Sequence, residues 1–544
     1  MTSIAANLSA LLTGSLCLYL VMALIKILHK YWWTPLRIQY AMNLQGIKGP
    51  PYKFIHGNNK ETERMTRDAL SKPLANLSHD ILPRVNPPVY SRINSYGKNY
   101  LSWAGTRAQL FITEPELVKE VLKSSEKAFP KRTSRERKWN DEEFALKILG
   151  DGLVTSEGEK WARQRKLANY AFHGDSLKSM TPAVIASVET MLERWKQFEG
   201  KEIEVFEEFR LLTSEVISRT AFGSSYLDGK KIFDMLLKLS VLTNRNLFKT
   251  KFPETTNSAL AWTVLLLAIN PDWQEKARRE VIEVFGNQNP HSEGIGRLKT
   301  MTMIINETLR LYPPVSGMAR TVENEVQLGK LILPADLQLV VPIVALHHDP
   351  QLWGDDVNLF KPERFAEGTA NATKHNAAAY APFGLGPRSC VGMSFAMTET
   401  KIALSMILQR YNISLSPTYS HSPYTLLLLQ PQHGIQLLIE AAASQSSQQV
   451  LVSIHVVVDD GIGTKCTSNQ MLLRDEYDCP CIFFSITEFS KMKTVNCSFQ
   501  LQHFTVTLRH GGEDVHVFKP EKFAEGEITL PRLSISLGSV IGKD

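Results

Sequence analysis

The chain opens with its longest run of apolar residues. Ile4 to Ile25 has only small or weakly polar interruptions, and a helix of that length reaches roughly 33 Å, enough to cross a bilayer. Basic residues follow the run, and "YWW" at residues 31–33 suits the headgroup level of a membrane. No basic stretch of the kind found in cleaved signal peptides precedes it. We therefore expect residues 1–30 to be an uncleaved, single-pass anchor with the body in the cytosol, followed by a stiff proline- and glycine-rich neck over residues 31–58.

Helical periodicity dominates the body of the chain. Apolar residues recur every three or four positions in Glu114–Ser125 and in Thr181–Phe198. Alternating, strand-like runs are confined to Gln109–Ile112 and Leu331–Val344. The pattern predicts a mainly α fold with a small β region over residues 59–443.

Composition narrows the possible functions. Hydrophobic residues make up 43% of the chain and charged residues 21%, as in a globular protein with a substantial core. The formal net charge of +6 suits a membrane surface or an acidic partner and does not indicate nucleic acid. The sequence contains no G-x-G-x-x-G and no P-loop, so nucleotide binding is not indicated. Between Lys30 and Gln445 the only cysteine is Cys390, which excludes a disulfide framework for the body and makes this thiol a candidate ligand.

This cysteine ends a glycine-rich loop, "PFGLGPRSCVG", at residues 382–392. Gly384 and Gly386 are expected to let the backbone turn tightly and approach a large, flat group. Cys390 precedes a stretch with the spacing of a long helix, whose N-terminal N–H groups and dipole favour a thiolate. Arg388 adds a cation nearby. A small buried hydrophobe is the alternative interpretation of a lone cysteine.

The loop resembles the haem-binding loop of the cytochrome P-450 haem-thiolate monooxygenases. Every fixed position of that signature is present, at Phe383, Gly386, Arg388, Cys390 and Gly392. The resemblance implies haem b as the cofactor, with the Cys390 thiolate as the axial iron ligand that favours O–O cleavage. It covers roughly the whole body of the chain and looks most like plant microsomal members that handle hormones and terpenoids.

Two further phrases, "ETLRLYPP" and "FKPERF", match the buried Glu–Arg–Arg network of this family. The match assigns Glu307, Arg310 and Arg364 a structural role, for which the planar fork of guanidinium is suited. Taken alone, an E-x-x-R pair fits a surface ion pair equally well.

A third phrase, "WARQRK", places Trp161 and Arg165 on one helical face. In the family this pair holds a haem propionate, whereas the pair alone also fits a solvated helix face. By the same resemblance, Arg320 and Arg388 are the other expected propionate partners.

The resemblance breaks at the oxygen-activating helix. The family phrase has the form Ala-Gly-x-acid-Thr, but here "KFP" precedes the acid, and its proline belongs at a helix start. Glu254 and Thr255 remain, and we expect them to deliver protons to bound oxygen. Several roof helices that should precede this phrase are absent. We interpret the break, near residues 245–254, as an internal deletion, with a compensated natural variant as the alternative.

Residues 444–544 form a tail without family resemblance. Within it, Gly512–Gly526 repeats Gly354–Gly368 with eleven of fifteen positions identical. Lys522 stands where the network arginine belongs, and no cysteine loop follows, so the copy cannot build a second haem site. The cysteines of the tail lack the spacing of metal ligands. We expect the tail to be dispensable.

The sequence thus predicts a monooxygenase of the endoplasmic reticulum membrane. By resemblance it would hydroxylate a small apolar substrate with O₂ and two electrons from NADPH-cytochrome P-450 reductase. Two alternatives stay open. One is a haem-thiolate isomerase or dehydratase that needs no reductase, and the other is a non-catalytic product of a faulty gene model or splice form. The sequence does not identify the substrate.

Overall fold

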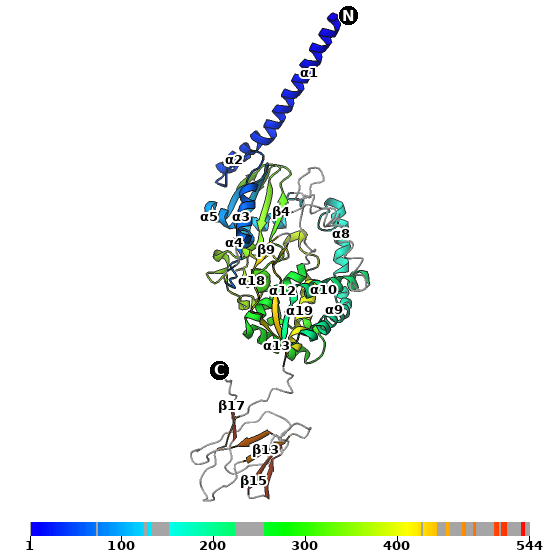
Figure 1. Cartoon of the computed structure of the whole chain (residues 1–544), viewed down its shortest axis with the longest axis vertical. Coiled ribbons are helices and arrows are strands. Elements are labelled where there is room, and N and C mark those ends of the chain that lie inside the picture. The colour runs from blue at the N-terminus through cyan, green and yellow to red at the C-terminus, as the bar shows by residue number, and fades with distance from the viewer. Residues whose placement is uncertain are drawn as a thin grey trace. The chain divides into compact units, whose positions relative to one another are not determined.

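The structure is a computed structural model. It describes residues 2–71, 74, 76–124, 128–131, 152–223, 255–425 and 428–442, and six short strands between residues 453 and 538. The chain divides into two compact units, residues 1–442 and residues 443–544. Figure 1 shows the first unit as rich in helices and the described parts of the second as strands.

The N-terminal helix extends well past the predicted anchor. Helix α1 (Thr2–Leu28) continues through the π-helical turn η1 (His29–Trp33) into α2 (Thr34–Leu44). Within Leu11–Leu44 lies an 18-residue window with a mean hydropathy of 2.2, and none of that window is buried. This length and composition fit a membrane span. The irregular part of the predicted neck is confined to residues 45–58.

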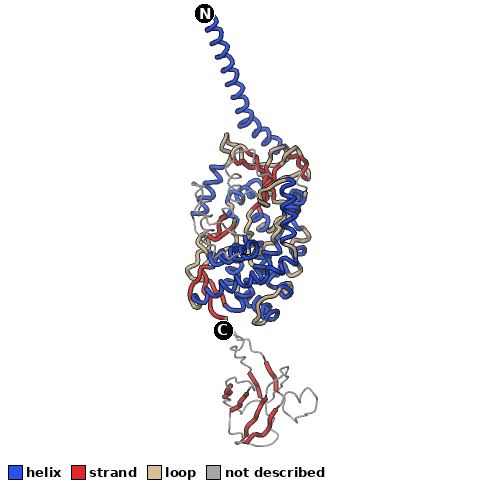
Figure 2. The backbone as a smooth tube through the Cα atoms, turned by 90° about the vertical axis from the view of Figure 1, so that its right-hand side faces the viewer, coloured by secondary structure: helices blue, strands red, loops and turns tan. Residues whose placement is uncertain are grey.

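Helices form most of the first unit (Figure 2). Helix α12 (Thr255–Ile269) is buried from Asn257 to Leu267, as expected of a helix that is apolar on all sides. It packs against α10 (Val205–Ile217), α15 (Lys299–Leu311) and α19 (Met393–Arg410). The other described helices and helical turns of this unit are α3 (Asn59–Ser71), α4 (Leu82–Val85), α5 (Pro87–Tyr96), α6 (Pro115–Lys123), α8 (Gly158–Ala171), α9 (Gly174–Trp195), η2 (Lys196–Phe198), η3 (Ser218–Phe222), α13 (Pro271–Phe285), α14 (Ser292–Ile295), α16 (Ile343–His347), α17 (Pro350–Trp353), η4 (Pro362–Phe365), α18 (Gly368–Ala372), η5 (Ala377–Ala379) and η6 (Gly386–Arg388).

Small sheets accompany the helices. The main sheet has the strand order β1-β2-β7-β4, in which β2 and β7 are parallel and the other pairs antiparallel. Most of its buried apolar side chains belong to a core that also includes Ile38, Met42 and Ile47. The strands of this unit are β1 (Asn99–Ala104), β2 (Arg107–Ile112), β3 (Lys201–Glu204), β4 (Gly317–Thr321), β5 (Val326–Leu328), β6 (Leu331–Leu333), β7 (Gln338–Pro342), β8 (Tyr411–Leu415), β9 (Pro423–Thr425), β10 (Leu429–Pro431) and β11 (Gln436–Ala441).

The predicted fold class, mainly α with a small β region, is confirmed. The helix expected over residues 114–125 is α6, and most of the one expected over residues 181–198 lies within α9. Strand β2 matches the predicted run at residues 109–112. The run at residues 331–344 divides into β6, β7 and the start of α16, because a short apolar stretch does not reveal by itself where a strand gives way to a buried helix.

In the second unit the described residues are strands. They are β12 (Ser453–Val456), β13 (Gln470–Arg474), β14 (Ile482–Ser485), β15 (Thr505–His510), β16 (Glu513–Phe518) and β17 (Ile535–Gly538). The repeated phrase changes its structure between the two units. In the first unit it forms turns and η4, whereas its copy contributes β16 to an antiparallel sheet. The phrase does not fix its own conformation, so its surroundings decide between turn and strand.

Candidate cofactor site

Cys390 lies at the N-terminus of a long helix. Helix α19 begins at Met393, and Gly392 is its N-terminal cap residue. The loop before it is closed by a hydrogen bond of 2.7 Å from the Cys390 N–H to the carbonyl oxygen of Phe383. The cysteine is therefore held by backbone bonds where the sequence predicted it, immediately before the helix.

The surroundings of the Cys390 thiol have opposing effects on its pKa. The side chain is accessible to solvent, yet protein atoms surround it closely enough that burial raises the pKa of the thiol. A hydrogen bond from the Gly392 N–H and the charge of Arg165 oppose that rise without cancelling it. The Gly392 N–H and Arg165 thus favour the thiolate, as the sequence predicts for this position, while burial favours the neutral thiol. A coordinated metal cation deprotonates a thiol outright, so a metal would complete this site.

The glycines of the loop have distinct neighbours. Gly386 has a φ of +70°, and a Cβ there would stand 2.2 Å from the carbonyl oxygen of Leu122 at the end of α6. A Cβ on Gly384 would meet the Sδ of Met318 at 3.4 Å. Gly392 differs, because among the described residues no atom apart from its chain neighbours lies within 4 Å of where its Cβ would stand. A side chain at Gly386 would therefore collide with the end of α6, whereas one at Gly392 would meet no described atom within 4 Å.

Cations gather beside the loop. The Arg388 guanidinium lies over the ring of Trp161, 4.0 Å from its centroid, and both of its terminal nitrogens donate to the carbonyl oxygen of Ser156 at 3.0 Å. From α8, Arg165 donates to the carbonyl oxygen of Ser389, next to the cysteine. The structure thus brings three of the predicted propionate residues around Cys390.

Arg320 comes from a different element. It lies on β4 two residues after Met318, and residues two apart share one face of a strand. Met318 is the residue whose sulfur faces Gly384, so Arg320 is on the face of β4 that borders the loop. The guanidinium is buried and donates to the carbonyl oxygen of Ala319 at 2.9 Å.

These residues fit a haem. A soft thiolate ligand suits iron, and guanidinium groups suit the carboxylates of a porphyrin. A Cβ on Gly392, next to the accessible thiol, would meet no described side chain within 4 Å, so a flat group can approach the loop on this side. Cys390 would hold the iron, and Arg165, Arg388 and Trp161 would hold the carboxylates.

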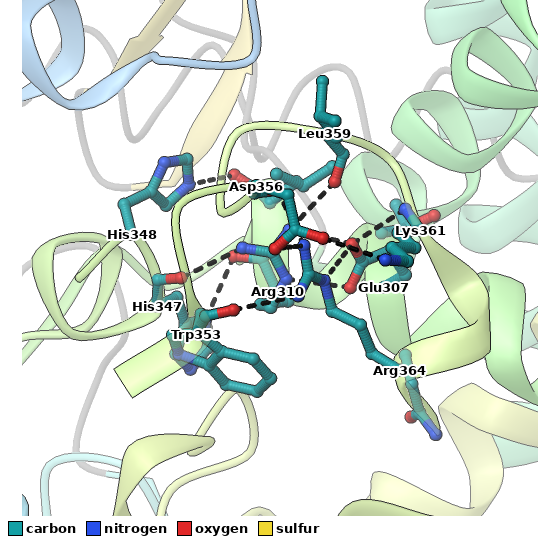
Figure 3. A network of polar contacts seen from close by, with 12 residues as sticks. Glu307, Arg310, His347, His348, Trp353, Asp356, Leu359, Lys361 and Arg364 are labelled. Atoms are coloured by element: carbon teal, nitrogen blue, oxygen red, sulfur yellow. Dashed lines mark hydrogen bonds and ion pairs between the residues drawn. The ribbon is translucent and has the colours of Figure 1, made fainter. Parts of the chain in front are cut away.

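A second polar cluster lies on α15. Arg310 donates from Nε and Nη2 to the two carboxylate oxygens of Glu307, each at 2.8 Å, and both side chains are fully buried. Arg310 also donates to the carbonyl oxygens of His347 at 3.1 Å and Leu359 at 3.3 Å (Figure 3). The pair is a buried, bidentate contact and not the exposed ion pair that the spacing alone allows.

Arg364 joins this cluster from η4. Its Nε lies 3.5 Å from Glu307 Oε1, and its Nη2 lies 2.6 Å from Asp356 Oδ1. It also donates to the carbonyl oxygen of Trp353 at 2.9 Å. The three predicted network residues are therefore together, and Arg364 fastens the Trp353–Asp356 segment to α15.

Sequence reasoning missed Asp356. Hydrogen bonds from Arg364 and Lys361 lower the pKa of its carboxyl group to about 2. Lys361 also donates its N–H to Glu307 Oε1 at 3.0 Å. Both residues lie within the repeated phrase, so the repeat itself was the available signal that the segment carries more than one network contact.

The predicted proton-delivery residues are only partly described. Glu254 and the expected deletion at residues 245–254 lie outside the described residues. Thr255 is the first residue of α12 and is exposed. The described helix of 15 residues is about 22 Å long by the helical rise.

Comparison with known proteins agrees with this geometry. Residues 90–253 and 253–439 match the family model described as Cytochrome P450. The chain is 48% identical over 512 residues to cytochrome P450 CYP749A22 of Panax ginseng, a match that covers 79% of this chain and 96% of that protein. It is 38% identical over 498 residues to 11-oxo-beta-amyrin 30-oxidase of Glycyrrhiza uralensis, covering 75% and 93%. It is 34% identical over 516 residues to 7-deoxyloganic acid hydroxylase of Catharanthus roseus, covering 78% and 97%.

Proposed function

The chain belongs to the cytochrome P450 family, and from this premise we propose that it hydroxylates a small, apolar, terpenoid-like molecule. The family consists of monooxygenases whose haem is ligated by a cysteine thiolate. Two of the relatives are named for the oxidation of 11-oxo-beta-amyrin and the hydroxylation of 7-deoxyloganic acid, which supports a terpenoid as the substrate class.

The observation that carries the proposal is the setting of Cys390. An accessible thiol at the start of α19, open space at Gly392 and two neighbouring guanidinium groups make a site for one anionic, flat, metal-bearing group. When bound, haem supplies the activation of O₂. The chain then orients the group through Arg165 and Arg388, and the Gly392 N–H donates to the sulfur of Cys390.

Two residues adjacent in the sequence, Glu254 and Thr255, are our candidates for handling protons. Glu254 is the acid, and Thr255 supplies a hydroxyl at the first position of the helix. A carboxyl group and a hydroxyl adjacent in the chain can pass protons toward bound oxygen if both face the same space.

Electrons come, in this proposal, from NADPH-cytochrome P450 reductase in the endoplasmic reticulum membrane, on the cytosolic side. The apolar helix α1 supports membrane attachment. Helix α8 exposes Lys160, Arg163 and Lys166 close to the cysteine loop, and a basic face of this kind attracts an acidic protein partner.

We also propose that this chain lacks a segment that its relatives possess, near residues 245–254. The family match divides at residue 253. Because 79% of 544 residues is about 430, an alignment of 512 positions leaves about 80 positions without a counterpart in this chain. The loss falls where roof helices are expected, so we expect slower turnover here than in a relative that has them.

The carbonyl spectrum of the reduced, haem-loaded chain tests the site. Thiolate ligation gives a red-shifted Soret band, which Cys390→Ser should abolish while the protein stays folded. A Soret band that persists in Cys390→Ser would contradict the assignment. A folded chain that takes up no haem would support the non-catalytic alternative.

Turnover requirements test the reaction. Hydroxylation should need NADPH, the reductase and O₂ together, and a terpenoid panel should contain the substrate. Product formation without reductase would instead support an isomerase or dehydratase.

A further inference from the structure

A buried cluster of aromatic and histidine side chains surrounds Tyr312, the residue that caps the C-terminus of α15. The Tyr312 hydroxyl lies 2.7 Å from His79 Nδ1 and 3.2 Å from His421 Nε2. Mainly because of burial, the pKa of each histidine is lowered to about 4, so both rings are neutral at neutral pH. A neutral imidazole nitrogen either donates to the phenol or accepts from it. The Tyr312 hydroxyl is therefore held from two sides, by segments that precede α4 and β9.

Helix α12 meets this cluster through Trp262. The Trp262 indole stacks on the Tyr312 ring, with 4.4 Å between centroids and 15° between planes. Its Nε1 also donates to the carbonyl oxygen of Leu429 on β10 at 3.4 Å. Leu429 is itself fixed to the segment after Tyr312, because its N–H donates to the carbonyl oxygen of Pro314 at 2.8 Å. Two contacts with elements distant in the chain therefore place Trp262.

The apolar side chains of α12 specify its rotation about the helix axis only weakly. The helix is buried on all sides from Asn257 to Leu267, so side chains of similar character cover every face. Between described residues, Trp262 makes the only hydrogen bond from a side chain of α12 to another element. An aromatic stack and a directional bond are satisfied at one rotation, whereas apolar packing tolerates alternatives of similar volume. Trp262 is therefore the residue that distinguishes one rotation of α12 from another.

Trp262 shares a face of α12 with Thr255, the first residue of the helix. The two residues are seven positions apart, which is nearly two helical turns. Their side chains therefore lie about 20° apart around the axis and roughly 10 Å apart along it. A rotation of α12 at Trp262 is thus a rotation of the Thr255 hydroxyl as well.

We propose that Tyr312 is a positioning residue for the monooxygenase reaction. With its hydroxyl held by His79 and His421, Tyr312 fixes Trp262 and thereby the rotation of α12, which decides where the Thr255 hydroxyl points. This inference rests on the proposed function, in which Thr255 handles protons. The effect of Tyr312 on the reaction passes through Trp262, so it should change where protons are delivered and not how haem is bound.

Amide hydrogen exchange tests the positioning separately from turnover. Tyr312→Phe, in the full chain in detergent, keeps the ring and removes the hydroxyl that His79 and His421 hold. We expect the amides of α12 to exchange roughly fivefold faster in this variant, because the stack then holds Trp262 less firmly. The matched control is Tyr380→Phe, which removes another buried hydroxyl, one that donates to the carbonyl oxygen of Asn306 at 3.0 Å. The control should leave exchange in α12 unchanged.

Peroxide release tests the consequence for the reaction. When protons reach bound oxygen wrongly, the two electrons from NADPH and two protons convert O₂ into hydrogen peroxide, and no substrate is hydroxylated. With reductase and NADPH, Tyr312→Phe should raise the peroxide formed per NADPH consumed about twofold or more, and Tyr380→Phe should not. Trp262→Leu acts on the other partner of the stack and should reproduce the effect of Tyr312→Phe. Thr255→Ala is the reference for misdirected protons.

The outcomes separate the positioning inference from the proposed function. Unchanged exchange in α12 of Tyr312→Phe would overturn the positioning inference alone. Equal effects of Tyr312→Phe and Tyr380→Phe on that exchange would also overturn it, because the cause would then be general destabilisation. Wild-type peroxide release by Thr255→Ala would overturn the proton role of Thr255, and with it the effect of Tyr312 on the reaction.

Discussion

Glu307 and Arg310 lie one helical turn apart on α15 and share two hydrogen bonds of 2.8 Å, with neither side chain exposed. A buried ion pair is weak evidence of net stability, but removing one partner leaves the other charge unpaired in the core. We expect Glu307→Gln to lower the free energy of unfolding by about 3–5 kcal/mol. Arg310→Lys should also destabilise the protein, because lysine keeps the charge and loses the bidentate fork. Chemical denaturation in detergent measures the free energy of unfolding of both variants. If Arg310→Lys were as stable as the wild type, the bidentate contact would not be what stabilises this pair.

The third network residue offers a matched comparison within one chain. Arg364 bonds to Trp353, Asp356 and Glu307 at once, which a single ammonium group cannot reproduce. Arg364→Lys should lower the free energy of unfolding by roughly 1–3 kcal/mol, the usual cost of leaving buried partners unsatisfied. Lys522→Arg makes the reverse change in the tail copy of the phrase and should alter neither stability nor haem content. A larger effect from Lys522→Arg than from Arg364→Lys would show that the tail copy serves the network.

Substitutions at two glycines of the cysteine loop should impair different properties, the stability of the fold and the uptake of haem. Gly386→Ala places a Cβ 2.2 Å from the Leu122 carbonyl oxygen at a φ of +70°, so it should destabilise the fold before any cofactor is bound. Gly392→Val adds a side chain in open space, so it should leave the melting temperature of the haem-free protein nearly unchanged and reduce haem uptake strongly. Differential scanning fluorimetry without haem and haem titration separate the two effects. Normal haem affinity in Gly392→Val would mean that the cofactor does not approach this side of the loop.

The site residues that could be predicted from the sequence are those whose role only one or two residue types can fill. Cys390, Glu307 and Arg310 were assigned through the resemblance to family motifs, which are recognisable because a thiolate ligand and a bidentate ion pair admit few substitutes. Asp356 was missed because its role depends on how a loop folds back onto Arg364, which no local pattern records. The contact of Gly386 with Leu122 was missed for a similar reason, since α6 lies more than 260 residues earlier in the chain.

The sequence pattern also did not predict where the N-terminal helix ends. Pro35 reads as a helix break, because proline lacks an N–H and crowds the preceding turn. Here the π-helical turn η1 precedes it, and the Thr34 hydroxyl donates to the carbonyl oxygen of His29 at 2.9 Å. The widened turn accommodates the proline, and the helix continues to Leu44.

Acid should destabilise the first unit through its buried histidines. Burial is the main reason that the pKa of His347 is lowered to about 3 and those of His79, His348 and His421 to about 4. Their neutral forms are held by bonds such as that of 2.7 Å between His79 Nδ1 and the Tyr312 hydroxyl. Below the ordinary histidine pKa of about 6.5 the unfolded chain binds protons that the folded chain does not, so stability falls as the pH falls toward about 4. Each such histidine adds a slope of up to about 1.4 kcal/mol per pH unit.

Unfolding midpoints at pH 7 and pH 5 test this dependence. The wild type should be clearly less stable at pH 5, and His421→Gln should show a shallower loss because one of the four titrating groups is gone. The comparison is between pH values for each variant, so a general destabilisation by the substitution does not mimic it. Parallel losses in wild type and variant would contradict a role for His421 in the acid sensitivity.

Removal of the tail should leave the haem domain intact. The first unit ends at residue 442, after β11 has paired with β3 and β8, so the sheet that closes this unit is complete before the tail begins. The network that the repeated phrase serves is also complete within the first unit, because Glu307 and Arg310 already bond with Arg364 and its neighbours. Truncation after Ala442 should therefore leave the haem content and the carbonyl spectrum unchanged, or raise the yield of soluble haem protein in detergent. If a segment is missing near residue 253, as we propose, restoring it should increase turnover far more than any change to the tail. Loss of haem uptake on truncation, in a preparation whose full chain binds haem, would mean that the tail is part of the fold.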